Sequence, residues 1–197
     1  FWELYDNIPM PDAVTGDWSR TVEETPQGFL AGAYENTNLH LLGKEQRAAS
    51  KRAYYACITQ VYYALGRIFG CLRENDLFKN TWVIFTADHG EMLGDHHMSQ
   101  KNLFFEGSAH VPLLIMPPQG RSLPQNISVE APTDLVDIYP TILAMAGLSS
   151  PVSVSGKNLL EPVPMDRMFF GNSLNKNFCV MEEKVKLVYS AVGDHVL

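Results

Sequence analysis

The sequence has no long hydrophobic run, few cysteines and no excess of basic residues. No apolar stretch approaches the ~20 residues that a membrane-spanning helix needs. Its three cysteines form no Cys-x-x-Cys pair, which argues against a zinc ribbon or a disulfide framework, and we expect Cys57, Cys71 and Cys179 to be small buried residues. The formal net charge of −7 argues against a nucleic-acid-binding surface, so any anionic substrate must be attracted by local charge.

The remaining composition fits a folded globular protein. The 197 residues are 46% hydrophobic and 19% charged, enough for one domain with a core. With no repeat or linker visible, we expect one domain, or part of one. It would comprise an irregular segment over residues 1–43, an α/β core with a metal-binding loop over 44–148, and a loop-rich part with short strands over 149–197. Because the chain starts at Phe1 without a methionine, we expect it to be an internal piece of a longer protein.

Apolar periodicity predicts the main elements of this core. An amphipathic stripe predicts a helix over residues 44–74, and it consists of Tyr54, Ile58, Val61, Leu65, Ile68, Phe69 and Leu72. β-branched and aromatic runs predict buried strands over 81–87 and 111–116, the first of them parallel to its neighbours. A helix over 133–147 would end at Gly147. Weaker patterns suggest strands at 127–129, 168–170 and 184–190.

The first of these strands stops abruptly at Asp88-His89-Gly90. In α/β folds the carboxyl ends of strands carry the functional sites, and a carboxylate with a neutral imidazole suits calcium, manganese, magnesium or zinc. The alternative is structural: Asp88 would cap the following turn and His89 would pack locally. The position at a strand end, followed by a glycine that permits a sharp turn, favours metal binding.

The loop after Asp88 and His89 contains further polar candidates. Glu91, Asp95, His96 and His97 are also capable of binding metal, but we expect at most one of the four to reach the active centre, with His96 and His97 as candidates to line the pocket. Lys101 is either a surface lysine or a contact for a phosphate- or sulfate-type anion, and the residues alone leave both open.

Two further polar residues, Glu106 and Ser108, follow Lys101. Glu106 has three possible roles: pairing with Lys101, orienting nearby backbone, or remaining a plain surface carboxylate. Ser108 is not in a Gly-x-Ser-x-Gly turn, which weakens a serine-hydrolase interpretation.

Several motifs in the same order resemble the C-terminal portion of the type I sulfatases, members of the alkaline phosphatase superfamily. They are residues 85–96, Lys101, residues 105–115, the helix over 44–74 and Asp137–Leu143, and the resemblance spans about residues 44–160. The Asp-His pair, in place of Asp-Asn, is similar to the choline-sulfatase and phosphonate monoester hydrolase branch. The resemblance implies an α/β fold, an alkaline phosphatase-like mixed sheet flanked by helices, of which only the C-terminal part is present.

The resemblance also implies a chemistry. Asp88 and His89 would hold a divalent cation, calcium in the first place and manganese or magnesium as alternatives. Lys101 would be catalytic and contact the sulfate oxygens of a small-molecule sulfate ester. The family's formylglycine nucleophile arises from a Cys- or Ser-x-Pro-x-Arg motif, which this sequence lacks. We therefore expect the nucleophile and the other metal ligands in a missing N-terminal half of the same protein, and we expect this chain alone to be inactive.

The resemblance has alternatives and local departures. A phosphonate monoester or phosphodiester hydrolase would use the same metal loop, and a non-catalytic binding domain would keep the fold without the reaction. Tyr62 stands where the family has an aspartate, and His110 where it has an arginine. We expect the first to alter a helix-to-strand contact and the second to alter contacts below the loop.

Overall fold

The structure, a computed structural model, describes residues 1–15, 42–101, 103–121, 126–173, 177–182, 185–190 and 195–196. Apart from the last few residues, the chain divides into two compact units, Phe1–Gly120 and Arg121–Ala191. The first contains η1 (Trp2–Tyr5), α2 (Lys44–Glu74), η4 (Leu77–Lys79), β1 (Val83–Thr86), η5 (Asp95–His97), α3 (Glu106–Ala109) and β2 (Leu113–Met116). The second contains η6 (Leu135–Asp137), α4 (Ile138–Met145), β3 (Phe169–Ser173), β4 (Asn177–Glu182) and β5 (Val185–Ser190), and β6 (His195–Val196) follows.

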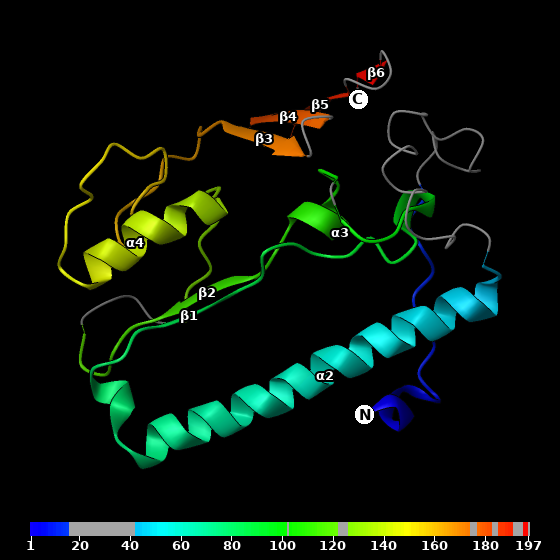
Figure 1. The fold of residues 1–197 in the computed structure, drawn as a ribbon, viewed down its shortest axis with the longest axis horizontal. Coiled ribbons are helices and arrows are strands. Elements are labelled where there is room, and N and C mark those ends of the chain that lie inside the picture. Colours follow the sequence, from blue (N-terminus) through cyan, green and yellow to red (C-terminus); the bar gives the residue numbers. More distant parts are fainter. Residues whose placement is uncertain are drawn as a thin grey trace. The chain divides into compact units, whose positions relative to one another are not determined.

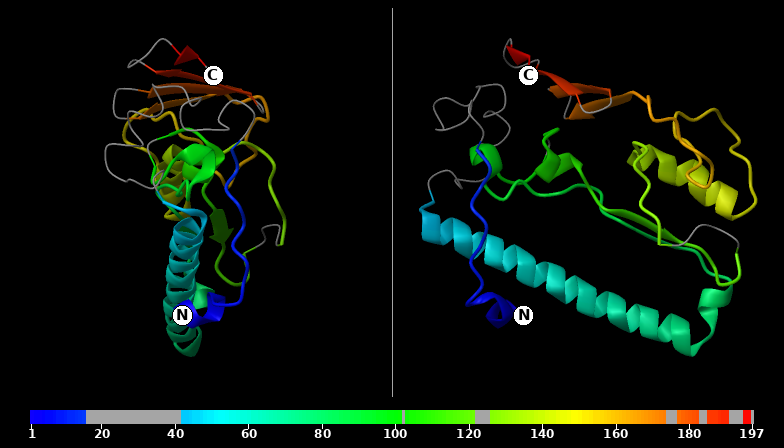
Figure 2. Two further views of the ribbon diagram at one scale, coloured as in Figure 1. Left: turned by 90° about the vertical axis from the view of Figure 1, so that its right-hand side faces the viewer. Right: turned by 180° about the vertical axis from the view of Figure 1, so that it is seen from behind.

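The long helix α2 has the bounds that the sequence predicts and is unbroken in both views of Figure 2. At its start the side chain of Gln46 accepts the backbone N–H of Gly43 at 2.8 Å. The predicted stripe is only partly covered, because Val61 is 55% exposed and Ile68 is 54% exposed. Near the N-terminus of the chain, Tyr5 stacks on Tyr55, and this contact fixes η1 against the helix.

Strands β1 and β2 form an antiparallel pair (Figure 1), with Val83 opposite Met116 and Thr86 opposite Leu113. The expectation that the first strand has parallel neighbours is wrong for this pair. A parallel return requires a crossover, usually a helix, whereas the described residues between β1 and β2 contain only the four-residue α3 and a short 3₁₀ turn. Both strands are also less buried than predicted, and Leu114 is 59% exposed.

A second sheet has the strand order β3-β4-β5-β6, and β4 pairs antiparallel with both β3 and β5. Strands β3 and β5 confirm the weak signals near 168–170 and 184–190, with β3 extending to Ser173. Strand β4 was not predicted, and the strand suggested at 127–129 does not form.

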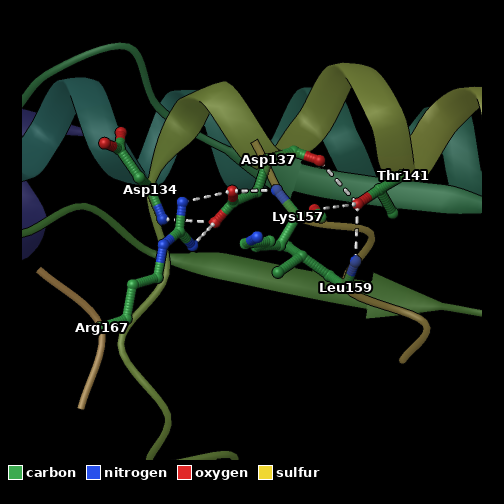
Figure 3. Close-up of polar contacts among 6 residues, drawn as sticks. All are labelled: Asp134, Asp137, Thr141, Lys157, Leu159 and Arg167. Atoms are coloured by element: carbon green, nitrogen blue, oxygen red, sulfur yellow. Dashed lines mark hydrogen bonds and ion pairs between the residues drawn. The ribbon is translucent and has the colours of Figure 1, made fainter. Parts of the chain in front are cut away.

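The predicted helix over 133–147 forms as η6 followed by α4, and it ends at Gly147, whose φ of +71° is the left-handed C-terminal conformation that glycine favours. At its start Asp137 is fully buried and forms a bidentate ion pair with Arg167, at 2.6 and 2.8 Å (Figure 3). The backbone N–H groups of Asp134 and Lys157 donate to the same carboxylate at 2.8 and 2.7 Å.

Thr141 extends this network by one turn (Figure 3). Its hydroxyl donates to the carbonyl of Asp137 at 2.6 Å and accepts the backbone N–H of Leu159 at 2.9 Å. Burial alone would raise the pKa of Asp137, but Arg167 and the two backbone donors outweigh it, so that this pKa is lowered. The network therefore fixes the loop around Lys157 to α4.

The three cysteines do not share one environment. Cys179 is buried, as predicted, and burial raises the pKa of its thiol. Cys57 and Cys71 are exposed, so the expectation is wrong for these two. Both lie on the part of α2 whose apolar residues are also exposed, and a helix face without a covering layer cannot bury a small side chain.

Candidate metal and anion site

Asp88 and His89 follow the end of β1 at Thr86, as the sequence predicts. The backbone N–H of His89 donates to Oδ1 of Asp88 at 3.0 Å, which fixes the carboxylate beside the imidazole. The other carboxylate oxygen, Oδ2, lies 3.5 Å from Nε2 of His89. The Asp88 side chain is 87% exposed and the His89 side chain 38% exposed, so the pair is accessible from outside this chain.

The imidazole of His89 has a defined orientation. Its Nδ1 lies 2.8 Å from the carbonyl oxygen of Gly90, and because a carbonyl only accepts, Nδ1 must carry the proton. In the neutral ring Nε2 then presents a lone pair toward the carboxylate oxygen of Asp88. Two electron-pair donors 3.5 Å apart are stabilised by a cation between them, either a proton or a metal. These two residues therefore fit one side of a divalent-cation site.

The loop that follows is attached to the rest of the unit by its backbone. Gly90 donates its N–H to the carbonyl of Ser108 at 2.8 Å, and a Cβ at Gly90 would lie 2.1 Å from the carbonyl oxygen of Gly107. Only glycine permits this approach. Met92 and Met98, which are 1% and 0% exposed, anchor the same loop in the interior.

Glu91 holds this loop together by hydrogen bonds to its backbone. Its Oε1 accepts the backbone N–H groups of Leu93 and Gln100, the two ends of the turn. Burial, followed by the negative charge of Glu91 and the neighbouring Tyr55, raises the pKa of Tyr54 on α2, so this carboxylate also lies close to the helix. From its sequence Glu91 was predicted only as a ligand-capable or solvated loop residue, so this structural role was not predicted.

The other polar residues of the loop tie it to the N-terminal segment. Asp95 accepts the backbone N–H of Val14 at 3.0 Å, and His96 donates its backbone N–H to the Val14 carbonyl at 2.7 Å. The His96 ring stacks on Phe105 at 4.6 Å between centroids. Left-handed backbone is concentrated in this loop, at Leu93, Gly94, His96, His97 and Gln100. Such clustering of costly conformations is typical of functional loops.

Lys101 ends the same loop and is exposed, with no ion pair or hydrogen bond to any residue in the described ranges. Its predicted contact with an anion stays a prediction. Glu106 pairs with His110 at 2.9 Å. That histidine in place of arginine alters the contacts below the loop stays a prediction.

Tyr62 makes a helix-to-strand contact, and its difference from the contact of an aspartate stays a prediction. Its ring stacks on Phe85 of β1, with 6.5 Å between the centroids. An aspartate at this position would offer a charge to the strand, whereas the tyrosine offers an aromatic face. This contact joins α2 to the strand that delivers Asp88.

Asp88 and His89 belong to no larger cluster of ligand-type side chains in the described residues. Among them no group of three His, Cys, Asp or Glu side chains lies close enough to hold a metal ion. Also within the described part, no helix has the length and apolarity to span a bilayer.

Comparison with known sequences identifies sulfatases as relatives of this chain. The family model described as Sulfatase matches residues 13–148. Arylsulfatase K of Canis lupus familiaris is 36% identical over 168 residues, covering 85% of this chain and 29% of that protein. An arylsulfatase of Clostridium perfringens is 32% identical over 162 residues, covering 82% of this chain and 33% of that protein. The chain thus spans about a third of the length of the curated relatives it matches.

Solved structures with a similar backbone include two phosphonate monoester hydrolases. The one from Silicibacter pomeroyi has a TM-score of 0.71 at 22% identity, covering 93% of this chain and 44% of that chain. The one from Agrobacterium radiobacter has a TM-score of 0.66 at 26% identity, covering 92% of this chain and 43% of that chain. At 22% identity, the similarity to the Silicibacter pomeroyi structure shows the fold alone.

Proposed function

The chain belongs to the sulfatase family, with the alkaline phosphatase-like mixed fold of which it contains less than half, and from that premise we propose that the intact protein hydrolyses sulfate monoesters. In this proposal the chain contributes part of a divalent-cation site and a lysine that contacts the sulfate. The nucleophile, expected to be formylglycine, lies in the missing N-terminal half, so that this chain alone is inactive.

The observation that carries the proposal is the arrangement of Asp88 and His89. The Gly90 carbonyl holds the proton of His89 on Nδ1, at 2.8 Å, and Nε2 is left beside a carboxylate oxygen at 3.5 Å. Such a backbone acceptor is the partner that metal-binding histidines ordinarily have. When bound, a divalent cation would neutralise charge that develops on the sulfuryl group.

Four residues of this chain would have distinct tasks in that reaction. Asp88 and His89 would bind the cation and fix its position. Lys101 would donate hydrogen bonds to the sulfate oxygens, whose negative charge its ammonium offsets. Glu91 would position the loop, because its carboxylate accepts the backbone N–H groups at both ends of the turn that precedes Lys101.

The metal assignment is tested by metal content. Asp88→Ala and His89→Ala in the full-length protein should each lower the bound metal, measured by elemental analysis after dialysis, by at least about tenfold, the usual cost of losing a ligand or its partner. His110→Ala is the matched control, because it removes an exposed imidazole that pairs with Glu106. Unchanged metal content in both ligand variants would show that the assignment is wrong.

Phosphonate monoester or phosphodiester hydrolysis is the second candidate, favoured by the backbone likeness to two phosphonate monoester hydrolases. Phosphoryl and sulfuryl groups share a shape and differ in charge, so one metal loop serves both. Rates of the full-length protein on matched aryl sulfate and aryl phosphonate esters distinguish the two. A higher kcat/KM on the phosphonate ester than on the sulfate ester would contradict the sulfatase proposal and support phosphonate hydrolysis.

A further inference from the structure

A cavity of about 220 Å³ lies beside the start of α2 in the first unit. Lys44, Arg47 and Lys51 line it from successive turns of one helix face. Asp12 contributes from the N-terminal segment. Gly94 and His97, from the loop that follows Asp88 and His89, also line it.

The charges around this cavity do not balance. Lys44 pairs with Asp12 at 3.5 Å, but both side chains are more than 80% exposed, so this pair contributes little. Arg47 uses one nitrogen to donate to the Leu42 carbonyl at 2.6 Å. In the described part of the chain neither Arg47 nor Lys51 has a carboxylate partner. The cavity is therefore locally cationic in a chain whose formal net charge is −7.

Lys51 is the most informative of these cations. It is only 6% exposed, and within the described ranges its ammonium makes one hydrogen bond, to the carbonyl of Pro11 at 2.9 Å. Lysine is almost never this buried unless it is paired, because removing an ammonium group from water is costly. An ammonium has three N–H donors, so two remain to be satisfied at the cavity. An anion in the cavity would be a charge partner for the buried ammonium and would accept its remaining N–H groups.

We propose that this cavity binds an oxyanion group, a carboxylate or a sulfate, that the substrate carries in addition to the ester that is cleaved. Its use by the substrate rests on the proposed function, whereas anion binding itself does not. Gly94 and His97, which line the cavity, belong to the loop that runs from Asp88 and His89 to Lys101. A molecule bound in the cavity therefore contacts the same loop as the proposed ester site. Arg47 and Lys51 would hold the anion by charge-assisted hydrogen bonds.

Anion binding is tested first, with inorganic sulfate as the probe. Lys101→Ala in the full-length protein, freed of divalent cation with a chelator, lacks both cations of the proposed ester site, and calorimetry then measures sulfate binding at the remaining site. Adding Arg47→Gln should weaken this binding about tenfold or more, as expected for a lost hydrogen bond to a charged group. The matched control is Arg67→Gln, which removes the same charge from an exposed position on the same helix and should change Kd less than twofold. Lys51→Met, similar in size, is the second variant in case the first fails to fold.

The use by substrate is tested with two esters that differ only in a ring carboxylate. Arg47→Gln should raise KM for the carboxylated aryl sulfate about tenfold more than for the plain one. An absence of sulfate binding in the Lys101→Ala protein, or equal effects of Arg47→Gln and Arg67→Gln, would overturn the anion site. An equal rise in KM for both esters would overturn the substrate role. Should neither ester be hydrolysed, the proposed function fails, while the calorimetry still decides the anion site.

Discussion

The buried ion pair between Asp137 and Arg167 allows a quantitative prediction for the second unit. Arg167→Met removes the guanidinium and leaves the Asp137 carboxylate, which is fully buried, with only the backbone donors of Asp134 and Lys157. Removing one partner of a buried pair costs about 3–5 kcal/mol. Because two of the four hydrogen bonds remain, we expect the lower end, about 3 kcal/mol, or roughly a hundredfold in the local opening constant.

Amide hydrogen exchange of the full-length protein measures this loss where it occurs. Peptides that cover residues 138–160 should lose about a hundredfold of protection in Arg167→Met, the equivalent of the same ~3 kcal/mol. Peptides from α2 serve as an internal reference. Asp166→Asn is the matched control, since it removes an exposed charge next to Arg167 and should leave protection unchanged. A loss of less than about threefold in Arg167→Met, or an equal loss in the control, would refute the assignment of the pair as a stabilising element.

The same pair predicts the behaviour in acid. Burial raises the pKa of Asp137, but Arg167 and the backbone donors lower it further, so the folded value lies below the unfolded one. A group of this kind contributes its full stability above the unfolded pKa, ~3.9 for aspartate, and loses it as the pH falls through the folded value. Protection of residues 138–160 should therefore persist from neutral pH down to about pH 4 and decline below it.

Three further substitutions test the metal loop. Gly90→Ala should lower both metal content and the thermal midpoint, because its Cβ would lie 2.1 Å from the Gly107 carbonyl oxygen, whereas Gly70→Ala, with open space around it, should not. Met98→Ala should cost about 2–5 kcal/mol in urea unfolding, since Met98 is fully buried, whereas Met168→Ala, 51% exposed, should cost little. Glu91→Gln should keep Asp88 and His89 but raise KM, because a neutral amide holds the Leu93 and Gln100 N–H groups less strongly than the carboxylate does.

The elements that the sequence predicted well are those whose signal is local. Helix α2 matches because 31 residues share one periodicity without an internal proline. Strands β1 and β2 were predicted two residues too long at their starts. Pro112 has no N–H to donate to a ladder, so β2 begins only at Leu113.

The missed elements depend on partners distant in the sequence. Strand β4 lacks alternation because its two faces carry similar side chains, buried Cys179 on one and partly exposed Phe178 on the other. The direction of β2 relative to β1 is decided by the route of residues 87–112, which periodicity does not encode. At the candidate site, the sequence places Asp88 and His89 at the end of β1, but it does not reveal the hydrogen bond that fixes the imidazole or the contacts of Glu91.

The number of ligands sets how tightly this chain by itself should bind a cation. Calcium takes six to eight oxygen ligands, and even tetrahedral sites need three or four protein groups, whereas Asp88 and His89 form no larger cluster with any other described residue. A site of two protein ligands and several waters forfeits most of the affinity of a complete one. We therefore expect the isolated chain to lose its cation on dialysis while the full-length protein retains it. Restored retention when the missing half is added in trans would show that the two parts share one site, and tight retention by the chain alone would contradict the two-ligand assignment.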